Sequence, residues 1–179
     1  MSYEELLALV ARGVIRNTNT DHINAASIDI TLGSKILKED TSDVHTSPKF
    51  VSLKRREPMK TVEYDCTNGF LLYPGEFILA QSQQMFELPD DISAEYKLKS
   101  SMARVGLNHA LAGFCDAGWH GSCLTLELMN VTKNHVIELN EGDRIGQMLF
   151  FHHRKVPEDR SYAARGRYNN DKTVEGVKP

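Results

Sequence analysis

The sequence has 179 residues, of which 41% are apolar and 25% are charged, with a net charge of −3. This balance is typical of one globular domain spanning 1–179 that folds without a disulfide or a metal. The negative net charge argues against binding to a nucleic-acid polymer, because domains that bind nucleic acid without sequence preference are usually basic. The cysteines form no CxxC pair, no apolar run is long enough for a membrane span, and the N-terminus has no signal-peptide pattern. We therefore expect a cytoplasmic protein with no membrane partner.

The first expected element is a helix at the N-terminus. Ser2 and Glu5 fit a capping box, and the apolar residues that follow share one helical face. Gly13 suits a C-terminal stop, so the helix should end near Arg12. We expect this helix to pack on the core without a chemical role.

After the helix, the apolar period changes from 3.6 to 2, which indicates strands. Short alternating runs occur at 28–32, 70–73, 77–80, 94–98, 124–128, 136–139 and 145–151. We expect a hairpin turn at 140–143 and a tight Gly-rich hairpin at 113–121, while 38–66 reads as a long polar excursion. No βαβ rhythm is present. The pattern predicts a mainly-β fold, a distorted barrel or jelly roll.

A polar block follows the expected strand at 94–98. Ser100, Ser101 and Arg104 lie within six residues, and Gly106 comes soon after. This predicts a short helical turn near 100–105 whose hydroxyls, backbone N–H groups and guanidinium form an anion site. The same residues also suit a capped turn with Ser100 as the N-cap and Arg104 in solvent.

Two carboxylates are candidates for activating water. Asp116 lies in the Gly-rich segment, and Glu127 interrupts an apolar strand on the face opposite its leucines. A carboxylate in a pocket can act as a general base. The alternatives are a turn Asp that bonds its own backbone and a solvent-facing Glu.

The polar residues 154–179 are expected to form a mobile C-terminal arm that adds little to the core. Arg160, Tyr162, Arg165 and Arg167 offer cations for phosphate and a ring for a base. The alternative is a disordered terminus. The histidines show no ligand spacing with the cysteines, so no metal site is expected, and no phosphate-binding Gly-rich motif occurs.

A set of short motifs in fixed order resembles the dCTP deaminase branch of the dUTPase superfamily. The motifs occupy 23–33, 72–76, 88–91, 100–107, 116–119, 124–127 and 141–147. The resemblance implies a dUTPase-type fold and a homotrimer with active sites shared between subunits. It also implies deamination of dCTP to dUTP by a water that no metal activates, with Mg²⁺ carried on the triphosphate.

The resemblance assigns a role to individual residues. Glu127 matches the general base, while Ser100 and Arg104 match residues that support the nucleotide and the reacting water. The carbonyl of Ala112 matches a group that orients this water. The implied substrate-binding residues are Lys99, Ser101, Met102, Ala103, Ala112, Asp116, Trp119, Thr125, Leu126, Tyr162, Arg167 and Asp171.

The sequence departs from the family pattern at several positions. It is one residue shorter than expected from 104 to 112 and one residue longer between Asp116 and Glu127, which we interpret as a β-bulge at 121–123. Asp171 stands where the deaminases usually carry Gln, and Arg167 replaces an expected Lys. The departures in the tail weaken the prediction that the tail contacts the phosphates.

Three other functions fit the same motifs. Asp116 also resembles the water-activating Asp of dUTPases, and Gly113 leans towards bifunctional relatives that deaminate dCTP and cleave dUTP to dUMP. A dUTPase without deaminase activity fits less well, because Trp119 replaces the usual Tyr and Glu127 would have no role. A different class is a non-catalytic nucleotide-binding regulatory module. Deamination of dCTP to dUTP is the expected activity.

Overall fold

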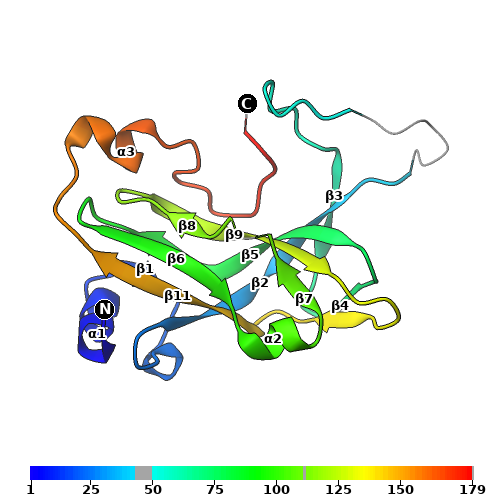
Figure 1. Ribbon diagram of the computed structural model, residues 1–179, viewed down its shortest axis with the longest axis horizontal. Helices are drawn as coiled ribbons and strands as arrows, with labels where there is room; N and C mark the ends of the chain where they lie inside the picture. Colours follow the sequence, from blue (N-terminus) through cyan, green and yellow to red (C-terminus); the bar gives the residue numbers. More distant parts are fainter. Residues whose placement is uncertain (43–49, 111, 179) are drawn as a thin grey trace.

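The computed structural model describes residues 1–42, 50–110 and 112–178 (Figure 1). The elements, in chain order, are α1 (Tyr3–Ala11), β1 (Ile15–Arg16), η1 (Thr20–His22), β2 (Ile28–Glu39), β3 (Thr61–Asp65), β4 (Phe70–Leu72), β5 (Phe77–Glu87), β6 (Ile92–Leu98), α2 (Ser100–Arg104), β7 (Leu107–His109), β8 (Phe114–Cys115), β9 (His120–Asn130), β10 (Ile137–Leu139), β11 (Arg144–His152), η2 (Glu158–Arg160) and α3 (Tyr162–Arg165). The mainly-β prediction is confirmed. No helix among the described residues is long and apolar enough to cross a membrane.

One curled antiparallel sheet organises the chain. Its strands lie in the order β7-β9-β5-β2-β11-β6-β8, with β1 added to β5 and β3 added to β2. Strands β4 and β10 form a separate two-stranded ribbon. Figure 1 shows α1 at one end of the sheet and α3 with the C-terminal segment above β8 and β9.

The core follows the alternation that the sequence predicts. Along β5 every second residue is buried, and in β9 the side chains of Leu124, Leu126 and Leu128 point inward. Burying this apolar face drives the sheet to close on itself. Helix α1 is fixed by the expected capping box at Ser2 and Glu5.

The prediction of a hairpin around 140–143 is wrong, because the two strands that flank this turn do not pair with each other. Strand β10 pairs with β4, whereas β11 pairs with β2 and β6. The turn docks on β2, where the Gly142 N–H donates to the Leu32 carbonyl and the Leu32 N–H donates to the Asp143 carbonyl. These bonds pair the backbone N–H and C=O groups of the turn with β2. The chain therefore continues as a strand beside β2 and not beside β10.

The Gly-rich segment 113–121 is also not a hairpin. Strand β8 pairs with β6 and β9 pairs with β5, so the two flanking strands lie in different parts of the sheet. A tight turn does connect them, closed by the Trp119 N–H donating to the Asp116 carbonyl at 3.2 Å. Gly118 supplies the positive φ of +86° that the turn requires.

Two further expectations concern the bulge in β9 and the polar excursion 38–66. The predicted bulge is confirmed at Gly121, since Phe86 pairs with Ser122 and Glu87 pairs with His120. The excursion 38–66 contains the pairing of β2 with β3, so its ends are strands. Residues 43–49 of this excursion lie outside the described residues.

Candidate active site

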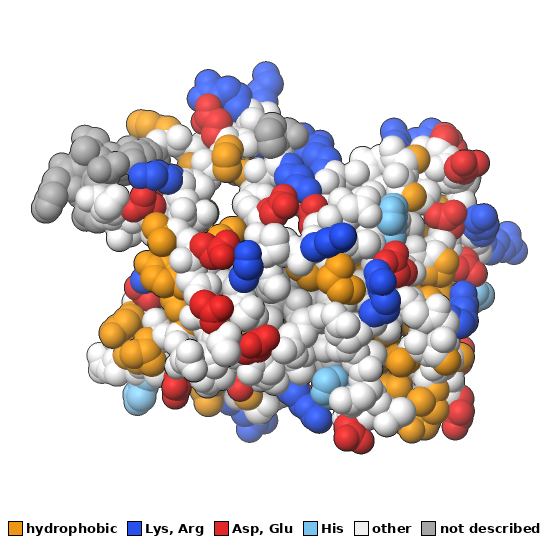
Figure 2. Space-filling model, turned by 180° about the vertical axis from the view of Figure 1, so that it is seen from behind, with side chains coloured by type: hydrophobic (Ala, Val, Ile, Leu, Met, Phe, Trp, Pro, Cys, Tyr) orange, Lys and Arg blue, Asp and Glu red, His pale blue; other side chains and the backbone are white. Residues whose placement is uncertain are grey.

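A pocket of about 620 Å³ lies on the outer face of β9. Five parts of the chain line it: the β8–β9 turn with the residues before it, the outward side chains of β9, the start of β5, the C-terminal arm and the segment 51–61 that leads into β3. Figure 2 shows the surface hollowed between the lobe at upper left and the main body of the molecule. The wall combines apolar side chains with carboxylates, which is typical of a small-molecule site.

Glu127 reaches this pocket because strand alternation turns it away from the core leucines. Its side chain is 25% exposed, and its Oε2 atom is buried with no hydrogen-bond partner among the described residues. The buried ring of His109, on the neighbouring strand β7, places Nε2 at 3.3 Å from Oε2. The prediction that Glu127 lies opposite the leucines is confirmed.

The β8–β9 turn brings Asp116 and Trp119 to the same pocket. The Trp119 ring is buried and stacks on Phe86 at 5.2 Å between ring centroids. Its Nε1–H donates to the Tyr168 carbonyl at 2.7 Å, which ties the turn to the C-terminal arm. The Asp116 side chain stays exposed at the pocket wall.

The arm contributes Tyr162, Tyr168 and Asp171 to the pocket lining. The Cys123 N–H donates to the Asp171 carbonyl at 2.8 Å, and Lys178 forms an ion pair with the Asp171 carboxylate. Burial raises the pKa of the Tyr162 hydroxyl. Val174 is only 4% exposed, so the arm contributes more apolar burial than its composition predicts.

Several predicted site residues meet in this pocket. They are Ala112, Asp116, Trp119, Thr125, Glu127, Tyr162 and Asp171. Leu126 does not, because its side chain is fully buried in the core on the other face of β9. Arg167 is exposed and lies outside the lining.

The Ser/Arg block forms the predicted short helix, α2, but outside the pocket. Lys99 rather than Ser100 is its N-cap residue, and Arg104 Nε–H donates to Ser100 Oγ at 3.3 Å. Ser101 and Ala103 are exposed, whereas Met102 packs against the core. Within one chain, therefore, the block and Glu127 belong to separate surfaces.

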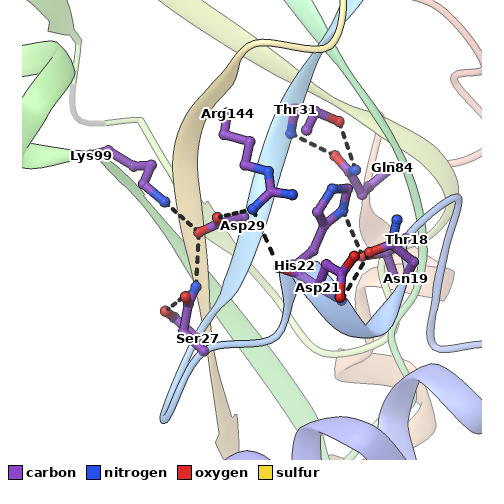
Figure 3. Close-up of polar contacts among 11 residues, drawn as sticks. Thr18, Asn19, Asp21, His22, Ser27, Asp29, Thr31, Gln84, Lys99 and Arg144 are labelled. Atoms are coloured by element: carbon purple, nitrogen blue, oxygen red, sulfur yellow. Dashed lines mark hydrogen bonds and ion pairs between the residues drawn. The ribbon is translucent and has the colours of Figure 1, made fainter.

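A buried carboxylate anchors this block at its N-terminal end (Figure 3). Lys99 Nζ donates to Asp29 Oδ1 at 2.7 Å, and Asn24 Nδ2 donates to the same oxygen at 2.8 Å. Arg144 lies 3.7 Å from the other oxygen of Asp29. The ring of His22 lies beside them, and burial together with the charge of Arg144 lowers its pKa, so it is neutral near pH 7.

Two features of the site were missed by the sequence analysis. His109 has no metal-ligand spacing in the sequence, yet the structure places it beside Glu127. Its signal was the pattern of β7, in which Leu107 and His109 are both buried around an exposed Asn108. Lys178 supplies a cation beside the pocket that nothing in the local pattern indicated. Among residues 1–42, 50–110 and 112–178, no three His, Cys, Asp or Glu side chains gather as a metal site.

Comparisons with known proteins identify the family and the fold that this chain resembles. A family model described as dCTP deaminase-like matches residues 1–153. A "dCTP deaminase, dUMP-forming" from Coprothermobacter proteolyticus is 34% identical over 171 residues, which are 92% of this chain and 87% of the relative. A protein of the same name from Beutenbergia cavernae is 41% identical over 109 residues, 60% of this chain and 55% of the relative. The chain thus spans about half the length of that relative.

Among solved structures, the 2′-deoxycytidine 5′-triphosphate deaminase of Agrobacterium tumefaciens has a similar fold. The TM-score is 0.65 at 23% sequence identity, and the match covers 84% of this chain and 46% of that one. At this identity the likeness shows the fold alone. The expected fold type is confirmed.

Proposed function

The chain belongs to the dCTP deaminase-like family, and we propose that it converts dCTP to dUMP in two hydrolytic steps. The observation that carries this proposal is the position of two carboxylates, Glu127 and Asp116, on the walls of one pocket. Each step needs a water molecule to be activated, and each carboxylate provides a base for one of them. Magnesium enters with the triphosphate, bound by phosphate oxygens and water.

The first step is deamination at C4 of the cytosine ring. Water attacks C4 while Glu127 accepts one of its protons, and the C4–N bond then breaks. Glu127 returns the proton to the leaving amine, and the second proton of the water passes from O4 to N3, so that dCTP and water give dUTP and ammonia. Ala112 lines the pocket and offers its carbonyl to orient this water.

The second step is hydrolysis of dUTP. A second water attacks the α-phosphorus, its proton passes to Asp116, and the bond to the pyrophosphate leaving group breaks. The products are dUMP and pyrophosphate. The sequence pattern favoured dUTP as the end product, whereas the dUMP-forming names of the relatives favour the alternative with this second step.

Product analysis of three variants tests the proposal. With dCTP and Mg²⁺, the wild type should release ammonia and accumulate dUMP on chromatography. Glu127→Gln should form neither product from dCTP but still cleave added dUTP, while Asp116→Asn should accumulate dUTP. Glu138→Gln, an exposed carboxylate on β10, is the control and should behave as wild type.

Each failure has a distinct meaning. If Asp116→Asn still yields dUMP at the wild-type rate, Asp116 is not the second base. If the wild type stops at dUTP, the chain is a deaminase alone. Nucleotide binding without turnover would identify a regulatory module and would contradict the proposal.

We further propose that α2 completes the pocket of a neighbouring subunit in a homotrimer. Its supporting observation is that Ser100 and Arg104 are exposed on a rigidly anchored helix outside their own chain's pocket. A phosphate or a reacting water needs a guanidinium in a fixed position. In this arrangement, Lys99, Ser100 and Arg104 of one subunit face the nucleotide that lies against Glu127 of the next.

Subunit mixing tests this arrangement. Arg104→Ala and Glu127→Gln should each be inactive alone, and their co-expressed mixture should recover about a quarter of the sites, because an intact site needs one subunit of each kind in one order. No recovery in a mixture shown by light scattering to be trimeric would mean that both residues act within one chain. A monomer that keeps its activity would also refute the arrangement.

A further inference from the structure

Within the part of the chain that the structure describes, three buried polar side-chain atoms have no hydrogen-bond partner, and all three lie in one part of the sheet. They are Tyr96 Oη on β6, His109 Nε2 on β7 and Glu127 Oε2 on β9. Buried polar groups are nearly always paired, because an unpaired one destabilises the fold. An unpaired set beside a candidate active site therefore points to a role in the site rather than in packing.

Strand pairing fixes the geometry of His109 relative to Glu127. His109 pairs with Leu128 across the β7–β9 ladder, and the Ala110 N–H donates to the Glu127 carbonyl at 3.1 Å. The His109 side chain is 4% exposed, and its Nε2 lies 3.3 Å from Glu127 Oε2. A small rotation of the ring is sufficient to make a hydrogen bond at this separation.

The ring is confined from its other side by Tyr96. The two ring centroids are 4.6 Å apart, with an angle of 58° between the planes. Tyr96 in turn lies against Gly146, where an added Cβ would meet its ring at 2.0 Å. His109 thus packs against a close wall that leaves room for only a small rotation, and its Nε2 lies 3.3 Å from the carboxylate oxygen.

We propose that His109 is a positioning residue for Glu127, donating Nε2–H to Oε2 and so directing the other carboxylate oxygen into the pocket. This inference rests on the proposed role of Glu127 in deamination. Since Oε2 is buried and the side chain still lines the pocket, the second oxygen is the one open to a water. A donor that occupies one oxygen prevents the carboxylate from rotating away from the water that it must deprotonate.

The other titratable groups packed around the pair, apart from Asp116, carry no charge near pH 7. Burial raises the pKa of the Cys115 thiol on β8 to about 12, and burial with the charge of Glu127 raises the pKa of Tyr96. Both groups are therefore neutral near pH 7. Asp116, the nearest carboxylate on the turn, is exposed.

Two substitutions separate positioning from packing. His109→Phe keeps the ring volume against Tyr96 but removes the N–H, and His109→Gln keeps a donor without the ring. We expect Phe to lower kcat on dCTP on the order of 10- to 100-fold, the rate equivalent of one hydrogen bond to a charged group, with KM nearly unchanged. Gln should recover part of this loss. Equal loss in both variants with a raised KM and a lowered thermal midpoint would overturn the proposal.

A spectroscopic measurement decides the hydrogen bond independently of turnover. In the ¹⁵N-labelled wild type, a slowly exchanging downfield imidazole N–H resonance should be present, should vanish in His109→Gln, and should shift in Glu127→Gln. If no such resonance exists, or if Glu127→Gln leaves it unmoved, the proposal is wrong. If the resonance behaves as expected but dCTP is not deaminated, the proposed function fails while the contact stands.

Discussion

Gly118 offers a sharp test of how the β8–β9 turn is held. Its φ is +86°, and a Cβ added there would lie 2.0 Å from Ser161 Oγ and 3.0 Å from Asp90 Oδ1. Ser161 donates its hydroxyl to Asp90 Oδ1 at 2.5 Å and caps α3 by accepting from the Ala163 N–H. Gly118→Ala should therefore strain the turn and displace the residue that docks α3 against it.

The cost has two parts. A non-glycine residue at this φ costs about 1–2 kcal/mol. Displacing the Ser161 hydroxyl removes a hydrogen bond to a charged group, about 1.5–3 kcal/mol. The sum is about 2.5–5 kcal/mol, which for a domain of this size lowers the thermal midpoint by roughly 5–20 °C. Because the turn carries Asp116 and Trp119, KM for dCTP should rise as well.

Gly142→Ala is the matched control. Gly142 has a φ of +88°, but an added Cβ would meet no atom of the described residues within 4 Å. It should show only the backbone cost, so thermal unfolding followed by circular dichroism should place its midpoint between those of the wild type and Gly118→Ala. In the Gly118→Ala background, Ser161→Ala should cost less than it does alone. Equal midpoints for the two alanine variants, or strictly additive costs, would refute the reasoning.

Further outcomes follow from the same structure. Glu127→Gln should lower kcat on the order of 10²- to 10⁴-fold while calorimetry still detects dCTP binding, since Gln cannot accept a proton. Deletion after Pro157 should raise KM for dCTP and also lower the thermal midpoint, because it removes Ser161, buried Val174 and the carbonyl that accepts from Trp119. A lowered midpoint with KM unchanged would make the arm purely structural. Cys66, Cys115 and Cys123 should resist a thiol reagent at pH 8 until the protein is unfolded, because burial raises their pKa values to about 11, 12 and 11. Since the unfolded thiols ionise first, stability should fall as pH rises from about 9 towards these folded pKa values, as measured by urea unfolding.

The strands were predictable because a half-buried sheet leaves a period of two in the sequence. The alternation around Glu127 and the capping box at Ser2 are both local patterns, and both are confirmed. The bulge at Gly121 could be inferred because one extra residue must be absorbed between two fixed motifs. Each of these inferences uses information that lies within a few neighbouring residues.

Strand partners were not predictable in the same way. The turn residues 140–143 and 116–119 reverse the chain as their composition indicates, but a turn does not fix which strand receives the next one. In both cases, backbone groups of the turn bond to distant elements, Leu32 of β2 for one and Pro89 for the other. Long-range hydrogen bonds of this kind leave no periodic signal.

The helix of the Ser/Arg block could be predicted from the sequence, but its position relative to the pocket could not. The motif correctly placed Ser100 and Arg104 on a short helix, while the structure of one chain places this helix apart from Glu127. The buried Asp29 that holds Lys99 gains little net stability from the ion pair, since desolvating the charges offsets most of the attraction. Its clearer consequence is orientation, because a lysine fixed on a buried carboxylate cannot swing freely. The proposed site between subunits requires such an anchored helix, because Arg104 must keep a fixed position relative to the nucleotide of the neighbouring chain.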